Sequence, residues 1–138
     1  MVYHETINFS TKGFCDVRNV TSEVLSAVGA SGVKDGTVCV SVTGSTLGVT
    51  TMEYEPNLVQ DFCDLMERMI PHDLKTRHGE TWGDDNGFSH LRASLIGPSV
   101  TLPVRDGRLM LGTWQQVVVA DFDNRPRERE AMITVVGE

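Results

Sequence analysis

The strand-like segment 113–123, TWQQVVVADFD, constrains the fold more than any other part of the sequence. Successive side chains of an extended strand point to opposite faces. One face would carry Trp114, Val118 and Phe122, and the other would carry Val117 and Val119. Because both faces are apolar, we expect the strand to be covered on both sides, inside a layered domain.

The same segment carries two glutamines, one on each face. An unpaired buried amide costs roughly 1–3 kcal/mol, so Gln115 or Gln116 must find a partner if it lies beside the core. A pocket, a neighbouring subunit or the opposing backbone would each supply that partner. The sequence leaves these three explanations open.

Two amphipathic helices are predicted. Residues 57–70 repeat apolar side chains with the rhythm of a helix that has one buried face, and Asn57 is the expected N-cap. Residues 20–31 form a shorter apolar stripe, and Gly32 offers a left-handed stop. These two segments are expected to be the main helices.

The stretch between the longer helix and the last strands mixes a loop with a short helix. Residues 72–86 show no periodicity, so we expect a long surface loop, a kind of connection that is often functional. A short helix would follow, capped by Ser89, and its inward side chains would be Leu91, Leu95 and Ile96.

Valine- and threonine-rich segments predict the strands. An opening strand and the turn after it cover 7–17, two strands interrupted by glycines lie between residues 36 and 55, and others cover 113–123 and 130–137. Asp106-Gly107 between apolar runs indicates a tight hairpin. Strands with helices grouped in this way predict an α+β fold: one domain over residues 1–138, with a mixed or antiparallel sheet, two main helices on one face and a short third helix.

Composition argues against several classes of protein. The chain has 138 residues and a formal charge of −7, which disfavours nucleic acid as a partner. No apolar run approaches the roughly 20 residues that a membrane span needs, so no membrane partner is expected. The start, MVYHETINFS, lacks the blocks of a signal peptide, and three scattered cysteines fit reduced thiols. Both features favour a cytoplasmic location.

The segment TWGDDNGFSHLRASLIGPS, residues 81–99, concentrates polar side chains. His78 and His90 bracket two acids there, an arrangement suited to proton transfer or to metal binding, although a loop histidine is often only exposed. The start of the short helix leaves backbone N–H groups free. Such an end suits an anion, and Arg92 would add a positive charge.

Two further polar rows each have two interpretations. Arg125, Arg127 and Arg129 share one face of a strand and could clamp a phosphate or carboxylate, or pair with acids on an adjoining chain. Glu53 and Glu55 share one side and could hold a divalent cation or share a proton. They could equally be acids that precede a helix, whose N-terminus favours negative charge.

No dinucleotide-binding, Walker, zinc-protease or nucleophile-elbow motif is present. The chain does resemble the YjbQ-like family of small proteins, also labelled secondary thiamine-phosphate synthase enzymes. The resemblance covers nearly the whole chain and rests on the blocks GSTLGVTTMEYEP, NGFSHLRASLIGPS, GRLMLGTWQQ and DFDNRPRER.

The resemblance implies an α+β homotrimer with polar clefts near its subunit boundaries and a small-molecule ligand. It also implies an activity that joins a hydroxymethylpyrimidine diphosphate to a thiazole phosphate, with Mg²⁺ or Zn²⁺ as a candidate cofactor. The family's recurring polar residues fall here on three candidate catalytic positions, Glu53, Asp85 and His90, on four candidate substrate-binding positions, Asn86, Arg92, Gln115 and Arg125, and on a candidate metal pair, His78 and His90.

Two departures from the family pattern bear on the metal. Many relatives have G-H-S-H where this chain has Gly87-Phe88-Ser89-His90. Many also have a histidine where Gly44 stands, although a Gly-Ser-Thr form recurs among relatives. If His78 and His90 bind a metal, a carboxylate or water must supply the remaining ligands.

Three functions are compatible with these residues. The first is an enzyme that acts on phosphorylated heterocycles. The second is a non-catalytic protein that binds a small phosphate or carboxylate metabolite. The third is a structural role in which the polar rows hold subunits together. All three assume that distant segments bring these polar side chains into one hollow, which a second copy of the chain could complete.

Overall fold

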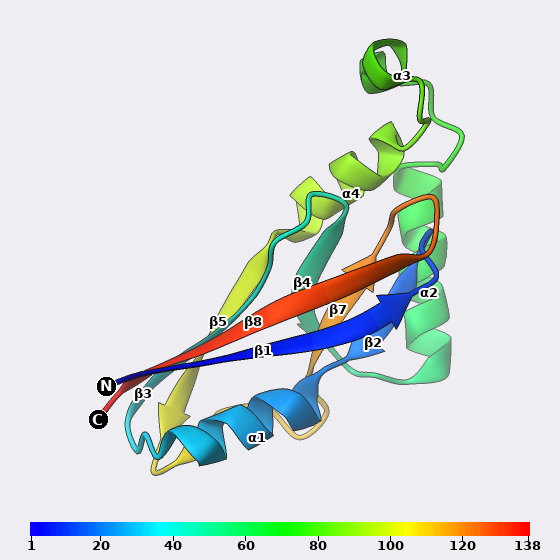
Figure 1. Cartoon of the computed structure of the whole chain (residues 1–138). Helices are drawn as coiled ribbons and strands as arrows, with labels where there is room; N and C mark the ends of the chain where they lie inside the picture. The colour runs from blue at the N-terminus through cyan, green and yellow to red at the C-terminus, as the bar shows by residue number, and fades with distance from the viewer.

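The computed structural model describes residues 1–138 and contains eight strands and four helices (Figure 1). In chain order these are β1 (Val2–Thr11), β2 (Asp16–Asn19), α1 (Thr21–Ser31), β3 (Gly36–Val42), β4 (Leu47–Met52), α2 (Pro56–Met69), α3 (Arg77–Trp82), α4 (Gly87–Ile96), β5 (Ser99–Arg105), β6 (Arg108–Leu109), β7 (Gln116–Asp121) and β8 (Arg127–Gly137).

The strands form two sheets in which every neighbouring pair is antiparallel. The order is β1-β8-β3-β5-β6 in the larger sheet and β2-β7-β4 in the smaller one. The predicted α+β class and the antiparallel pairing are thus confirmed. The smaller sheet packs against the larger one through Val117 and Val119 of β7.

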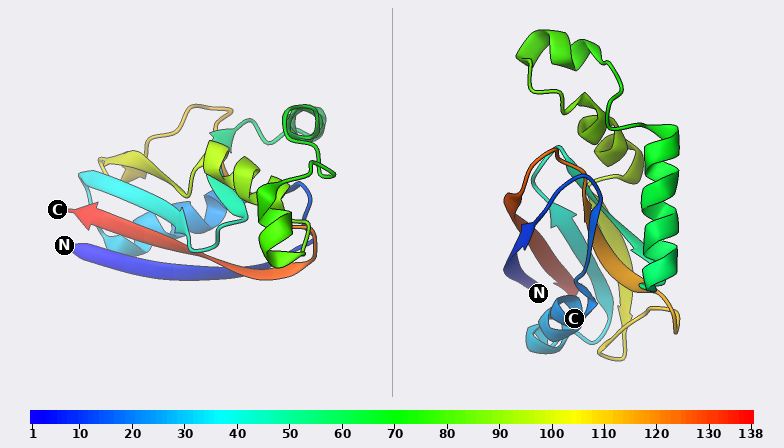
Figure 2. Two further views of the ribbon diagram at one scale, coloured as in Figure 1. Left: turned by 90° about the horizontal axis from the view of Figure 1, so that it is seen from above. Right: turned by 90° about the vertical axis from the view of Figure 1, so that its right-hand side faces the viewer.

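Strand β7 is the centre of the layered structure, as its doubly apolar sequence predicts. Val117 and Val119 belong to the larger core, which α1 and the five-stranded sheet complete. Val118 and Ala120 belong to a second core, which α2 and α4 cover. Seen from above, these two helices lie on the opposite side of the molecule from β1 and β8 (Figure 2).

The two main helices form where the pattern places them, with one difference at a cap. Helix α1 ends at Gly32, whose φ of 71° is left-handed, as expected. Helix α2 begins at Pro56, and its N-cap is Glu55 rather than Asn57. The Glu55 carboxylate accepts hydrogen bonds from the N–H groups of Asn57 and Leu58 at 2.5 and 3.3 Å. Of the two interpretations of Glu55, the acid at a helix N-terminus is correct.

Helix α4 begins earlier than predicted, at Gly87, and Ser89 is not its cap. Leu91 and Leu95, expected to face inward, are 47% and 56% exposed. The inward face instead carries the neighbouring residues of each turn, Phe88, Arg92 and Ala93. The helix is rotated because the buried arginine, described below, makes its hydrogen bonds inside the protein.

The predicted loop 72–86 contains a short helix, α3, that the sequence pattern did not predict. Thr76 caps it by accepting a hydrogen bond from the N–H of Gly79. Both figures show α3 beyond the end of α4, away from the sheets (Figures 1 and 2). We call residues 71–86 the arm.

The prediction of three reduced cysteines is wrong for two of them. Cys15, in the turn before β2, forms a disulfide with Cys63 of α2, and Cys39 is free. The separation of 48 residues concealed the pair, because sequence distance says nothing about proximity in a folded chain. None of the four helices has the length and apolar character needed to cross a lipid bilayer.

Candidate functional site

Two buried aspartates at the end of β7 organise the most polar part of the interior. Asp121 and Asp123 are both fully buried. The chain then turns back into β8, where Arg127 and Arg129 lie on the inward face. A buried carboxylate is tolerated when it is paired and hydrogen-bonded, and the two arginines supply those pairs.

Arg129 binds Asp121 through two parallel hydrogen bonds. Its Nε lies 2.7 Å from Oδ2 of Asp121, and its Nη2 lies 3.0 Å from Oδ1. Thr11 donates to the same carboxylate, from strand β1. The Nη2 group also donates to Oγ1 of Thr46 at 2.6 Å. Three strands and the β3–β4 loop are therefore joined at this one ion pair.

Arg127 binds the second aspartate. Its Nε lies 2.7 Å from Oδ2 of Asp123, and Asn86 donates to Oδ1 at 3.3 Å. Burial by itself raises the pKa of Asp123. The hydrogen bonds from the Asn124 N–H, from Asn86 and from Arg127 outweigh burial and hold that pKa below its ordinary value. Asp123 is therefore a stable anion at neutral pH.

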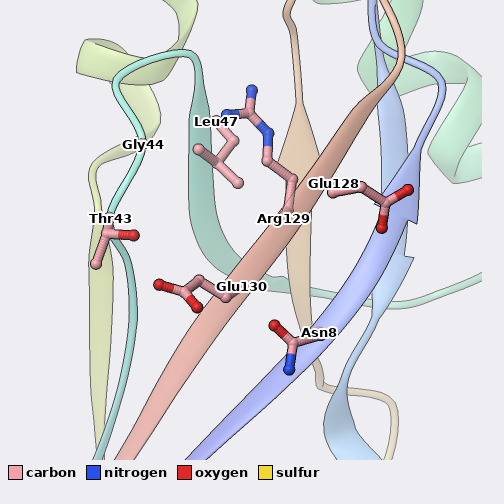
Figure 3. A pocket seen from close by; sticks show the side chains of 7 residues that line it. All are labelled: Asn8, Thr43, Gly44, Leu47, Glu128, Arg129 and Glu130. Atoms are coloured by element: carbon pink, nitrogen blue, oxygen red, sulfur yellow. The ribbon is translucent and has the colours of Figure 1, made fainter.

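A pocket of about 500 Å³ opens beside these ion pairs. We call it the main pocket; its lining residues are Val42, Thr43, Gly44, Ser45, Thr46, Asn86, His90, Asp123, Arg127 and Arg129. An adjoining hollow of about 460 Å³, the side pocket, shares Thr43, Gly44 and Arg129 with it. Figure 3 shows Arg129 rising from β8 toward Leu47 in the side pocket, while Glu130 points toward Thr43.

The arginines keep donors that no group of the protein uses. The two Nη groups of Arg127 and Nη1 of Arg129 have no hydrogen-bond partner in the chain. The Nε of each arginine is held by an aspartate, so each guanidinium is fixed in orientation while its outer donors are available. A fixed guanidinium fork is suited to a carboxylate or a phosphate.

His78 and His90 are brought together, as the sequence suggests. Their ring centroids are 4.5 Å apart, and His90 also lines the main pocket. Oδ1 of Asp84 lies 3.5 Å from Nδ1 of His78, which has no other partner. The imidazole pair thus connects the pocket to the carboxylate of Asp84 on the arm.

The expected divalent metal does not fit the residues of this chain alone. Nowhere are three His, Cys, Asp or Glu side chains arranged to hold a metal ion. Zinc sites usually use three or four protein ligands, and here His78 and His90 are only two. Asp123, the one carboxylate that lines the main pocket, is already paired with Arg127.

The main pocket contains only some of the residues predicted for it. Asn86 and His90 line it. Arg125 is exposed and lines none of these hollows, and the next two members of the arginine row take the place expected for it. Asp85 is also exposed, with a left-handed φ of 57°, and lines a separate hollow in the arm. Its backbone turns the chain into α4.

Arg92, expected to attract an anion, is instead 2% exposed and fully engaged. It donates to the carbonyl of Ile70 at 2.7 and 2.9 Å, to the carbonyl of Phe14 at 2.8 Å and to the carboxylate of Glu67 at 2.7 Å. Its guanidinium lies 4.9 Å from the ring centre of Phe88. Arg92 therefore joins α4 to the end of α2 and to the β1–β2 turn.

Glu53 and Gln115 lie away from His90 within one chain. Glu53 follows the end of β4, whereas the main pocket lies at its start, and Glu53 lines a different hollow with Tyr54 and Trp114. Gln115 donates to Oγ1 of Thr51 at 3.1 Å and accepts from the N–H of Gly112 at 3.0 Å. The expected hollow shared by Glu53 and His90 is thus not formed by a single chain.

Asp121, Asp123 and Thr46 were not predicted as members of the site. The sequence does carry a signal for the aspartates: the alternation of 113–123 places both of them on the face that carries Val117 and Val119, together with Gln115. A buried carboxylate on an apolar face requires a cationic partner, and the arginine row at 125, 127 and 129 follows directly along the chain.

Asp123 should make the stability of the protein depend on acid pH. Because its folded pKa lies below the ordinary 3.8, the stabilisation is complete well above pH 3.8 and is lost as the pH falls through the lower, folded value. Urea unfolding from about pH 6 to about pH 3 should show falling stability. In Asp123→Asn this component of the slope should vanish, and equal slopes in both proteins would contradict the assignment.

The fold and the pocket define a small antiparallel α+β protein with a polar, arginine-lined pocket. The chain belongs to the family described as UPF0047 protein YjbQ-like, whose model matches residues 5–138. A UPF0047 protein of Methanothermobacter thermautotrophicus is 34% identical over 137 residues, 99% of this chain and 94% of the relative. One from Methanocaldococcus jannaschii is 34% identical over 121 residues, 87% of this chain and 84% of the relative.

Solved structures show the same fold. A YjbQ-like protein of unknown function from Sulfolobus solfataricus P2 matches with a TM-score of 0.95 and 30% identity, over 100% of this chain and 99% of that one. A hypothetical protein from Aeropyrum pernix matches with a TM-score of 0.85 and 30% identity, over 97% and 99% of the two chains.

Proposed function

We propose that the main pocket binds the anionic group of a small metabolite, a phosphate or a carboxylate. One observation carries the proposal: the guanidinium of Arg127 is held by Asp123 through Nε and keeps both Nη groups free at the pocket. Preorganised donors of this kind bind anions without the entropy cost of ordering a flexible side chain. His90 and Asn86 add polar groups to the same wall.

Calorimetric titration with inorganic phosphate and with acetate tests this proposal. Arg127→Gln should weaken binding of the preferred anion about tenfold or more, because a charge-assisted hydrogen bond contributes about 1.5–3 kcal/mol. Arg125→Gln is the matched control, since Arg125 is exposed two residues away and lines none of these hollows. Equal affinities of the two variants, or no binding of either anion by the wild type, would reject the pocket as an anion site.

A second candidate is the thiamine-phosphate synthase reaction that the family resemblance implies. In that reaction the thiazole nitrogen attacks the methylene carbon of the pyrimidine diphosphate, the carbon–oxygen bond breaks, and diphosphate leaves. The imidazole pair favours this candidate, because His90 beside Arg127 could donate a proton to the departing phosphate oxygen. Purified protein given both precursors should then form thiamine phosphate, and His90→Ala should abolish it while the exposed His4→Ala does not.

The assembly proposed for the chain is a homotrimer. The separation of Glu53 from His90 supports it, because a second copy could bring one residue to the other. Light scattering from purified protein should give three times the mass of one chain. A monomeric mass would remove this explanation for the position of Glu53.

A further inference from the structure

The loop between β3 and β4, residues 43–46, forms part of the wall of the main pocket, and all four of its residues line it. The four backbone N–H groups of this loop donate no hydrogen bond within the protein. Thr46 is only 5% exposed, and backbone groups in such surroundings are nearly always paired. The loop therefore has unused donors at the place where the ligand is proposed to bind.

The loop is held in place at both of its ends. The carbonyl of Thr46 accepts from the N–H of Phe122 at 2.9 Å, and the N–H of Val42 donates to the carbonyl of Pro98 at 3.0 Å. The hydroxyl of Thr46 contacts both Asp123 and Arg129. The unused N–H groups thus belong to an anchored segment, as a preformed binding site requires.

Gly44 lets this loop approach Arg129 closely. A Cβ atom at position 44 would lie 2.9 Å from Nη1 of Arg129 and closer still to the side chain of Leu47. The absence of a side chain therefore places backbone donors of the loop beside a guanidinium donor. Groups with partial or full positive charge from β8 and from the loop meet at one hollow.

Charge balance explains why the backbone donors matter. The two carboxylates of Asp121 and Asp123 already neutralise the two guanidinium groups of Arg127 and Arg129. A bound anion therefore meets little net positive charge, so its binding depends on directed hydrogen bonds from the guanidinium groups and from oriented backbone dipoles. Successive backbone N–H groups provide such dipoles in phosphate-binding loops.

We propose that residues 43–46 are a phosphate-binding loop, in which backbone N–H groups and the outer donors of Arg127 and Arg129 hold a phosphate group rather than a carboxylate. This inference rests on the proposed anion site and specifies its ligand. Donors come from two walls, the loop and β8. A phosphate presents three terminal oxygens in different directions, whereas a carboxylate presents two in one plane. Val42 is the one hydrophobic residue of the lining, so the bound part of the ligand is hydrophilic.

Ser45 offers a matched pair of variants for the test. Its side chain is exposed and makes no hydrogen bond. Ser45→Ala retains the backbone N–H and removes only the hydroxyl, so it is the reference with which Ser45→Pro is compared. Ser45→Pro removes that N–H and should weaken phosphate binding about tenfold. The wild type should also bind phosphate about tenfold more tightly than acetate, because the acetate leaves loop donors unpaired.

A second measurement does not depend on the folding of the proline variant. In the wild type, the backbone amide proton resonances of residues 43–46 should move downfield as inorganic phosphate is added, with one common saturation curve. Unmoved resonances, or Ser45→Pro binding phosphate as Ser45→Ala does, would overturn the loop while Arg127→Gln could still confirm the anion site. If wild-type protein binds acetate as tightly as phosphate, the ligand class is wrong. If it binds neither, both proposals fail.

Discussion

Replacing Arg129 with methionine is expected to lower the free energy of unfolding by about 3–5 kcal/mol, because breaking a buried ion pair leaves one charge unpaired. Asp121 would lose both of its bidentate hydrogen bonds while remaining 0% exposed. For a chain of this size the thermal midpoint should fall by about 10–20 °C. Differential scanning calorimetry of Arg129→Met measures the change directly.

Two controls separate the ion pair from general damage to β8. Glu130→Gln alters the next residue, which is exposed, and should change the midpoint by no more than about 2 °C. The double variant Asp121→Leu with Arg129→Met removes both charges and should recover part of the lost stability. If the double variant is less stable than Arg129→Met, the unpaired carboxylate is not the cause of the loss.

Replacing Arg92 with methionine should be almost as costly, by about 3 kcal/mol or more, because it leaves partly buried acceptors without a donor. The carbonyls of Ile70 and Phe14 would lose their side-chain donor, and Glu67 would lose its ion pair while keeping its hydrogen bonds from His72. Urea unfolding measures this loss. Arg105→Met, an exposed arginine on β5, is the control and should be nearly neutral.

The same variant distinguishes a structural arginine from a ligand-binding one. At a temperature where Arg92→Met is still folded, its affinity for phosphate should equal that of the wild type, since all guanidinium nitrogens of Arg92 are used inside the protein. A stable Arg92→Met with weakened phosphate binding would contradict the structural role and restore the anion-binding role expected from the sequence.

Much of the fold could be predicted because local patterns and tertiary packing agree. The doubly apolar β7, the stripe of α1 that stops at Gly32 and the Asp106-Gly107 hairpin all form as expected. In each case a period of two residues, a period of 3.6 residues or a positive φ decides the local structure. No distant contact needs to be known.

The errors occur where a distant contact overrides the local pattern. Leu91 and Leu95 looked like the buried side of α4, but Arg92 takes that side because its acceptors come from α2 and from the β1–β2 turn. Cys15 and Cys63 become neighbours only after those same elements pack together. The spacing of residues along the sequence does not show which distant segments pack together.

The candidate site was predicted in part for the same reason. His78 and His90 were grouped correctly, and the arginine row was recognised as a face of one strand. The sequence did not predict that the length of β4 separates Glu53 from the main pocket. It also did not predict the turn that places Asp121 and Asp123 against β8. The alternation of β7 did place both aspartates beside buried valines, and a search for their cationic partners would have led to Arg127 and Arg129.

The position of β8 in the larger sheet has a consequence for biosynthesis. Strand β8 lies between β1 and β3, and its register joins Val2 to Val136. While a ribosome is still making residues 1–126, neither β1 nor β3 has this neighbour, and Asp121 has no Arg129. The nascent polypeptide therefore has an incomplete larger sheet and an unpaired Asp121 until β8, a strand of eleven residues, emerges. A translation pause or a shortage of chaperones at that stage should lower the yield of folded protein more than a delay at an earlier codon.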